Sequence, residues 1–228
     1  MRCLLLALLF VPAAAPAATR TVSVGSFERI RIDGPFEVRV QTGRSPGATI
    51  TGDVHATDEV QVRVTGSTLV VAQGTNGWGE QAGAAKGPIV VTLSTPNLVS
   101  AVVVAGGRLT ISGMKAMRVD LSVSGAGSLS LAKADTDQLN ATVLGTGQMT
   151  VGGRAARARL TTSGPGVIDA STLAVRDLTV VLDGVGETKA MASGSAQVTN
   201  TGLGMVTVTG PAQCLVKAPA GGPVSCGR

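Results

Sequence analysis

Aromatic side chains are nearly missing from this chain. They make up 2% of its 228 residues, with no Tyr, three Phe and one Trp. A core with so few aromatic residues must be aliphatic and shallow. A surface without them lacks the stacking platforms that bind single-stranded nucleic acids. The basic residues are scattered singly rather than in runs, so the net charge of +5 does not indicate a nucleic-acid partner.

Catalytic residue types are also scarce. There is one histidine, His55, and a histidine-based triad would have to use it, yet no Gly-x-Ser-x-Gly elbow accompanies a suitable Asp and His. We therefore assign His55 to the surface and expect no catalytic site, no cofactor and no metal. Charged residues are only 14% and apolar residues 44%, a composition that differs from that of disordered chains.

The segment from Met1 to Ala18 is typical of a secretory signal peptide. Arg2 supplies the positive start, Leu4 to Val11 form an apolar run too short to span a bilayer, and Ala15-Pro16-Ala17 offers a cleavage pattern. We expect cleavage after Ala17 or Ala18. This leader predicts that the mature chain is exported, to the periplasm, the cell surface or the extracellular space. No later stretch is apolar enough for a membrane helix, so no integral membrane segment is expected in the mature chain.

Glycine is abundant instead, with 31 residues, and its spacing organises the chain. Five Gly-x-Gly triplets recur at intervals of about 20 residues, a period in the range of solenoid repeats. Aligned on the first glycine, positions two, four and six before it are mostly apolar, and the positions between them are mostly polar. The triplets are Gly125/Gly127, Gly145/Gly147, Gly164/Gly166, Gly184/Gly186 and Gly202/Gly204.

Alternation with a period of two predicts a half-buried strand on each side of every triplet. A unit of roughly 18–20 residues cannot bury its own apolar face, but stacking on a neighbour does so. We therefore predict an all-β fold, a parallel β-helix or β-solenoid, in which these ten glycines form the turns because glycine accepts positive φ and close backbone approach. A β-sandwich of hairpins is the alternative, since it also uses Gly-rich turns.

The rest of the chain flanks this array. Residues 19–73 predict a β segment that caps the solenoid, with Phe27 and Phe36 plugging its end. Residues 74–87 predict a flexible loop whose Trp78 is either a contact residue or packed back on a strand. The solenoid itself is expected at 88–210, starting near Pro88. These parts are expected to form one continuous domain.

The tail, residues 211–228, holds Cys214 and Cys226, the two cysteines that remain after the leader is removed. In an oxidising compartment such a pair is expected to form a disulfide. Two cysteines without a nearby histidine cannot fill a tetrahedral metal site.

Three further patterns bear on function. The triplets lack the Asp of calcium-binding solenoid repeats, and no helical pattern follows them as in nucleotide loops. The acids Asp120, Asp169, Asp183 and Glu187 fall in different columns, so no carboxylate cluster is expected. A partial hydroxyl ladder on the outer surface could bind ice or a glycan, although Thr is also simply a good outward strand residue. It contains Ser122, Thr142, Thr161, Val181 and Thr199.

The repeats Ser124-Gly125-Ala126-Gly127 and Ser163-Gly164-Pro165-Gly166 resemble those of the putative auto-transporter adhesin head GIN domain family, DUF2807. Phe27-x-x-Ile30 and Gly34-Pro35-Phe36 resemble that family's opening. The resemblance implies an envelope or secreted β-solenoid and supplies no catalytic residues.

The sequence thus favours a non-enzymatic interaction module that binds an envelope glycan or protein through its outward faces. The alternatives are a periplasmic structural or regulatory protein with a protein partner, and a polysaccharide-active β-helix enzyme.

Overall fold

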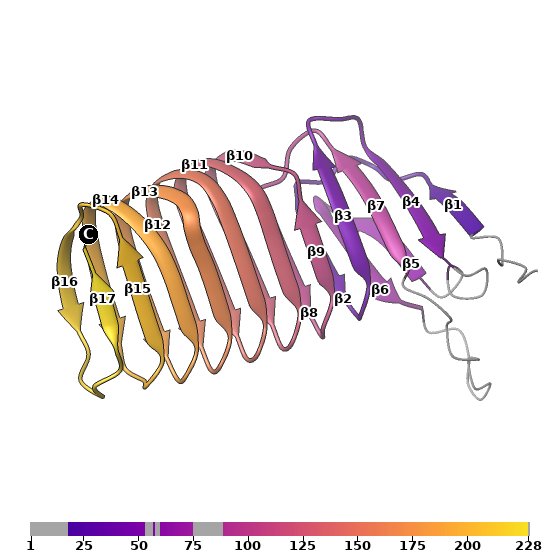
Figure 1. Ribbon diagram of the computed structural model, residues 1–228. Helices are drawn as coiled ribbons and strands as arrows, with labels where there is room; N and C mark the ends of the chain where they lie inside the picture. The colour runs from indigo at the N-terminus through magenta and orange to yellow at the C-terminus, as the bar shows by residue number, and fades with distance from the viewer. Residues whose placement is uncertain (1–17, 53–56, 58–59, 75–88, 228) are drawn as a thin grey trace, which may run out of the picture.

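The computed structural model describes residues 18–52, 57, 60–74 and 89–227 (Figure 1). The expected leader up to residue 17, His55, and Trp78 with most of its loop lie outside these ranges. Within them, seventeen strands join in one sheet. The first seven are β1 (Ala18–Val22), β2 (Arg29–Asp33), β3 (Glu37–Thr42), β4 (Gly47–Gly52), β5 (Val60–Thr65), β6 (Thr68–Gln73) and β7 (Val90–Thr95). The other ten are β8 (Ser100–Val104), β9 (Arg108–Ile111), β10 (Met114–Ser124), β11 (Ser128–Leu144), β12 (Gln148–Ser163), β13 (Val167–Asp183), β14 (Glu187–Asn200), β15 (Met205–Thr209), β16 (Gln213–Lys217) and β17 (Val224–Cys226).

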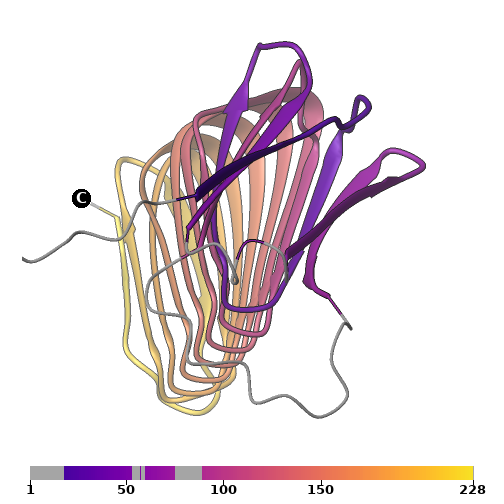
Figure 2. The same ribbon diagram turned by 90° about the vertical axis from the view of Figure 1, so that its right-hand side faces the viewer.

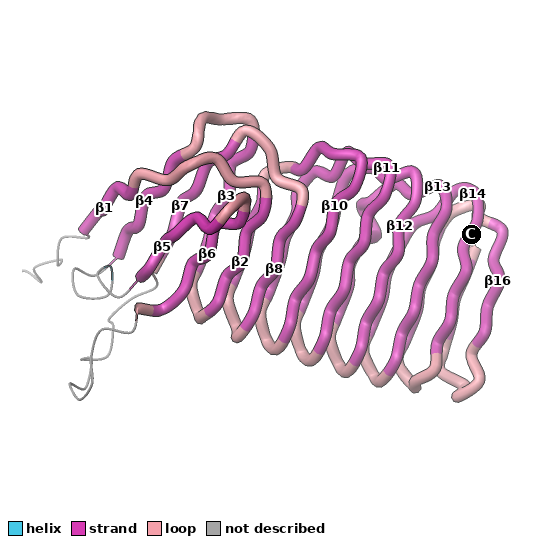
Figure 3. Tube along the Cα trace, turned by 180° about the vertical axis from the view of Figure 1, so that it is seen from behind, coloured by secondary structure: helices cyan, strands magenta, loops and turns pink. Residues whose placement is uncertain are grey.

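The repeat region is a stack of parallel coils. β10 to β14 pair in parallel with one another in chain order, and the register follows the sequence period: Val123 lies beside Val143, which lies beside Thr162. The bends line up along one edge of the stack (Figure 3). The predicted fold class, an all-β parallel solenoid, is confirmed, and the β-sandwich alternative is excluded by the parallel pairing.

Each coil of the repeat region has three faces. The leading face precedes the bend, as in 119–124, and the trailing face follows it, as in 128–131. The connection that the sequence pattern indicated as a short return is a third strand segment, the return face. In β10 and β11 it pairs Met114 with Ala134 and Arg118 with Gln138. Long strands such as β11 therefore turn two corners, with a register shift between Leu131 and Ala134.

The core is a narrow, mostly aliphatic column. The inward positions of the leading and trailing faces contribute to it, as the alternation predicts, and the return face adds residues such as Met114, Leu173 and Val175. Two of the hydroxyls within it form a pair: Thr162 and Thr188 are fully buried and their oxygens lie 2.9 Å apart. Each hydroxyl therefore supplies the other's partner in a region that is otherwise apolar.

The stack begins earlier in the chain than the expected start near Pro88. β2 and β3 pair in parallel with β8 and β9, so 29–42 is itself a coil with its bend at Gly34. β6 and β7 pair in parallel with the other edges of β2 and β3. The coil of β2 and β3 bends at Gly34 without a Gly-x-Gly triplet, and the strands that pair with it come from segments far apart in the sequence. The periodic pattern therefore gave no sign of them.

Three of the described strands, β1, β4 and β5, pair antiparallel beyond these coils. β4 pairs with β7, β1 with β4, and β5 with β6. They open away from the stack at its N-terminal end (Figure 2). Phe27 and Phe36 are buried at 1% and 4% exposure, but they lie directly before β2 and β3 and belong to the core of the stack rather than to a separate cap.

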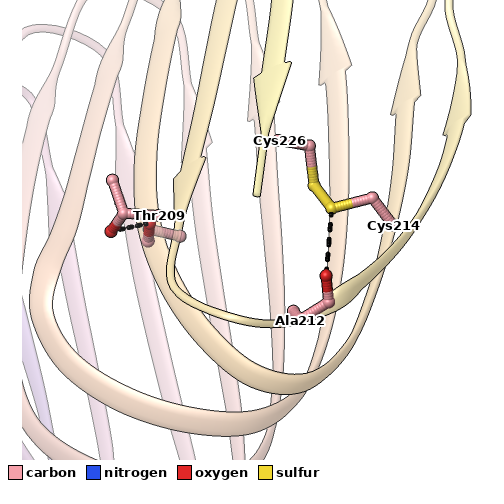
Figure 4. Close-up of a disulfide and its surroundings, with 5 residues drawn as sticks. Thr209, Ala212, Cys214 and Cys226 are labelled. Carbon is pink, nitrogen blue, oxygen red and sulfur yellow. Dashed lines mark hydrogen bonds between the residues drawn. A yellow bond between two sulfur atoms is a disulfide. The ribbon is translucent and has the colours of Figure 1, made fainter. Parts of the chain in front are cut away.

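The last coil consists of β16 and β17, which pair in parallel with β14 and β15. Cys214 lies beside Ala196, and Cys226 lies beside Val208. The predicted disulfide between the two cysteines is confirmed, with 6.2 Å between the Cα atoms (Figure 4). It joins the two strands of the last coil across the C-terminal end of the core.

Candidate functional site

The bend glycines meet two different structural requirements. Gly164, the first of its triplet, has φ +97°, which L side chains rarely adopt. Gly147, the second of its triplet, is not in the left-handed region but is buried against the preceding coil, where a Cβ would lie 2.5 Å from Val123 Cγ1. The triplet therefore combines a left-handed bend with close stacking, and it leaves no space for a ligand between coils.

The second glycine of every triplet lies in this buried position, where it is the close approach of neighbouring backbones that requires glycine. At Gly186 an added Cβ would meet the carbonyl oxygen of Gly166, and at Gly204 it would meet that of Gly186. These glycines are therefore needed for close stacking and are not accessible to a partner. The five buried glycines are Gly127, Gly147, Gly166, Gly186 and Gly204.

The last triplet departs from the others at its first glycine as well. Gly202 is not in the left-handed region that Gly125, Gly145, Gly164 and Gly184 share. A Cβ there would meet the backbone of Gly184, so close approach alone requires the glycine. At this bend the Asn200 side chain hydrogen-bonds to the backbone of the turn. Its amide donates to the Gly204 carbonyl at 2.8 Å, and its oxygen accepts from the Gly202 N–H at 3.1 Å.

The acids that a polysaccharide-active enzyme would use are spread over the coils, each with a partner. Their partners are the Asn140 amide for Asp120, the hydroxyl and backbone N–H of Ser171 for Asp169, the Thr201 hydroxyl for Asp183 and Lys189 for Glu187. Among the described residues, no group of three His, Cys, Asp or Glu side chains is placed to hold a metal ion.

A shallow groove lies on the return face, around the exposed side chain of Met117. A groove of about 660 Å³ is lined by residues of three successive coils. They are Lys115, Ala116, Met117, Asp135, Thr136, Asp137, Arg154, Ala155 and Ala156. We call this surface the Met117 groove.

Met117 is placed by the corner between the return and leading faces. The parallel register runs through Ala116 and Arg118 but skips Met117, so its backbone turns there. The Thr136 hydroxyl of the next coil donates to the Met117 carbonyl at 3.2 Å and holds that corner. The side chain faces solvent: Met117 is 80% exposed, the highest value among the large apolar residues that the structure describes as exposed.

An ion-paired carboxylate lies beside it. Arg154 donates two hydrogen bonds to Asp135, at 2.8 and 3.2 Å, and Lys115 Nζ lies 3.8 Å from the same carboxylate. The hydrogen bond from Arg154, and then the charges of Arg154, Lys115 and Lys133, lower the pKa of Asp135 below its usual range. The same carboxylate raises the pKa of Arg154. At neutral pH this wall of the groove is a fixed charge pair.

A second depression continues from the first. It has a volume of about 440 Å³ and shares Ala116 and Met117 with the Met117 groove. Its remaining lining includes Arg29, Arg118 and Asp120, and Arg118 donates a hydrogen bond to Gln138 at 3.0 Å. Met117 thus stands between two shallow hollows bordered by charges of both signs.

The Met117 groove combines three kinds of lining group. It offers one adaptable apolar side chain, a pre-formed guanidinium–carboxylate pair and small Ala residues as a floor. The sequence pattern did not reveal it, because the return looked like a connection. A signal was present: Met117 is a large apolar residue at a position where the next two coils carry Asp137 and Ala156.

The other predicted contact residues are placed as follows. Trp78 lies outside the described residues. The hydroxyl ladder of Ser122, Thr142 and Thr161 aligns in register on the leading face. The trailing face has a comparable row, with Thr110, Ser130 and Thr150 in register. Neither row lines the Met117 groove or the depression beside it.

The fold and this surface define a class: parallel β-solenoids with shallow outer surfaces. The chain belongs to the family described as "Putative auto-transporter adhesin, head GIN domain" (DUF2807), whose sequence profile matches residues 26–212. No functionally curated protein matches it in sequence. Among the residues that the structure describes, no helix is long and apolar enough to cross a bilayer.

Solved structures share its fold. A putative adhesin from Bacteroides fragilis superposes with a TM-score of 0.82 at 21% identity, over 94% of this chain and 97% of the other. A putative adhesin from Parabacteroides distasonis gives 0.70 at 18% identity, over 93% and 95%. A putative lipid binding protein from the same organism gives 0.68 at 17% identity, over 92% and 94%. At these identities the likeness concerns the fold.

Proposed function

We propose that this protein is a non-enzymatic, exported interaction module that binds a protein partner of the cell envelope or its surroundings through the Met117 groove. The observation that carries this proposal is Met117 itself, 80% exposed between two hollows with charged borders. Methionine and arginine are enriched at the cores of protein interfaces, and exposed apolar groups rimmed by polar ones mark interaction sites.

The charge pair supports a protein partner. Asp135 and Arg154 are already joined, so their net charge is near zero and they hold a fixed geometry. A partner would bury them without leaving either group unpaired, which limits the cost of desolvation. Lys115 and Arg118 remain at the rim, where charges mainly steer association.

The non-enzymatic interpretation is supported by the distribution of acids described above. The family and the two solved structures described as putative adhesins support an exported binding role. Adhesion from the cell surface is the finer proposal, and a periplasmic partner is its alternative.

Site-specific photo-cross-linking in the producing cells tests the groove. A photoreactive amino acid replaces Met117, and a matched variant carries it at Leu203, which is 68% exposed in a distant bend. We expect position 117 to give a discrete adduct with a second protein, and we expect Arg154→Ala to reduce its yield. Equal adducts at both positions, or an adduct unaffected by Arg154→Ala, would contradict the proposal.

Protease added to intact cells decides the compartment. Digestion of the mature chain would support adhesion at the surface. Protection until the outer membrane is opened would remove the adhesin role and direct the search to periplasmic partners.

A further inference from the structure

The C-terminal end of the stack presents a free strand edge. β16 pairs with β14 along one side, and no described strand pairs with its other side. All five of its residues are exposed, including two large apolar ones, Leu215 at 57% and Val216 at 41%. An exposed edge with apolar side chains is a template for pairing with another strand.

The opposite end of the solenoid differs. There the outermost parallel strands, β6 and β7, are covered by the antiparallel strands β5 and β4. At the C-terminal end the disulfide Cys214–Cys226 lies across the core, but it leaves the backbone edge of β16 open. The disulfide also fixes this edge, because it ties β16 to β17. The edge therefore loses little conformational freedom on pairing.

The sequence of β16 is self-complementary. If two copies pair antiparallel about Leu215, each Leu215 lies opposite its counterpart on the outer face, and each Cys214 lies opposite Val216 of the other copy on the inner face. Lys217, the one charged residue of the strand, then lies opposite Gln213 and not opposite a second Lys217. Apolar groups thus meet apolar groups, and the like charges are separated.

Pairing of β16 with the N-terminal end of another copy would not separate like charges in this way. The outer strand β5 there carries Arg63, and β1 carries Arg20, so Lys217 would approach further positive charge. A two-fold contact also closes on itself, whereas a head-to-tail contact would extend into a fibre.

We infer that the protein forms a two-fold dimer through antiparallel pairing of β16 with β16 of a second copy. The two solenoids join end to end and extend the leading face into a sheet shared by both copies. This surface is distinct from the Met117 groove, which lies on the return face several coils away, so the two hypotheses can fail separately.

Cysteine cross-linking tests the register. Directly opposite residues in antiparallel strands have Cα atoms about 4.5 or 5.5 Å apart, within the range of a disulfide. Leu215→Cys should therefore form a disulfide-linked dimer under mild oxidation. Gln213→Cys and Lys217→Cys should not do so alone, since each would be roughly 14 Å from its own counterpart. Mixed together, these two variants should cross-link to each other. Mass mapping confirms in each case that Cys214–Cys226 is intact.

Sedimentation of the full mature chain gives the second readout. The wild type should show a concentration-dependent dimer. Leu215→Lys places two ammonium groups opposite each other and should weaken dimerisation roughly tenfold or more. The matched variant Leu203→Lys, on a bend, should leave it unchanged. A wild type that stays monomeric, or a dimer that Leu215→Cys fails to cross-link, would overturn the inference.

Discussion

Gly147→Ala should destabilise the solenoid far more than a usual glycine-to-alanine change. An added Cβ would lie 2.5 Å from Val123 Cγ1, 2.8 Å from the Gly127 carbonyl oxygen and 3.1 Å from that of Gly125. Two of these three contacts are backbone atoms of the preceding coil, so relief requires the coils to separate. Overpacking of this kind costs about 1–3 kcal/mol and occasionally more. We place this variant at the upper end, about 3 kcal/mol.

Unfolding in urea, followed by far-UV circular dichroism, measures the effect, and a thermal scan should show the midpoint lowered by about 6–12 °C. Gly25→Ala is the matched control, because its added Cβ meets nothing within 4 Å and its backbone is not in the left-handed region. Replacing a compatible glycine by alanine stabilises by about 0.4–1 kcal/mol. If Gly147→Ala unfolds at the same midpoint as Gly25→Ala, close coil stacking is not what requires glycine there.

Three further predictions concern side chains. Thr162→Val and Thr188→Val should each lower the free energy of unfolding in urea by about 1–3 kcal/mol, because each leaves the other hydroxyl unpaired. The double variant should lose less than the sum of the two single losses, and strictly additive losses would refute the buried pair. Cys214→Ser should lower the free energy of unfolding by about 3 kcal/mol under oxidising conditions and leave it unchanged under reducing conditions. A thermal midpoint equal to that of the wild type under oxidising conditions would count against a stabilising disulfide. Carboxyl NMR titration should place the pKa of Asp135 below that of an ordinary aspartate, and Arg154→Ala should raise it. Because the pKa of Asp135 is lower in the folded than in the unfolded chain, this ion pair stabilises the fold at pH values above the unfolded-state pKa, and the stabilisation is lost as pH falls through the folded-state pKa. An Asp135 pKa that Arg154→Ala does not change would contradict this.

The repeat region could be predicted from the sequence because its partners are local. Each coil contacts the next repeat along the chain, so residues that share an aligned position, such as Val123, Val143 and Thr162, are also the residues that lie side by side in the stack. Even so, the column could not show that Thr162 is compatible with a buried position. Its partner Thr188 belongs to a different column and to the trailing face, and only the closure of the coil brings the two hydroxyls together.

The N-terminal coils could not be predicted in the same way. The bend at Gly34 does not repeat the glycine triplet, and the pairing of Arg29 with Ser100 joins distant segments without a periodic signal. The Met117 groove was missed for a different reason. Its lining comes from the return face, where small and polar residues do not alternate strictly, and the exposure of one methionine depends on a corner that the sequence pattern does not mark.

The placement of β2 and β3 has a consequence for how the chain reaches this structure. They come early in the sequence but lie between the β6/β7 coil and the β8/β9 coil, so both of their neighbours are made after them. As the chain emerges from its N-terminus, residues 29–42 can complete their stacking only after β9 has emerged. The later coils, by contrast, need only the next repeat. Assembly is therefore expected to start in the repeat region and to proceed backwards to the N-terminal end, since non-local pairing carries the larger loop-closure cost.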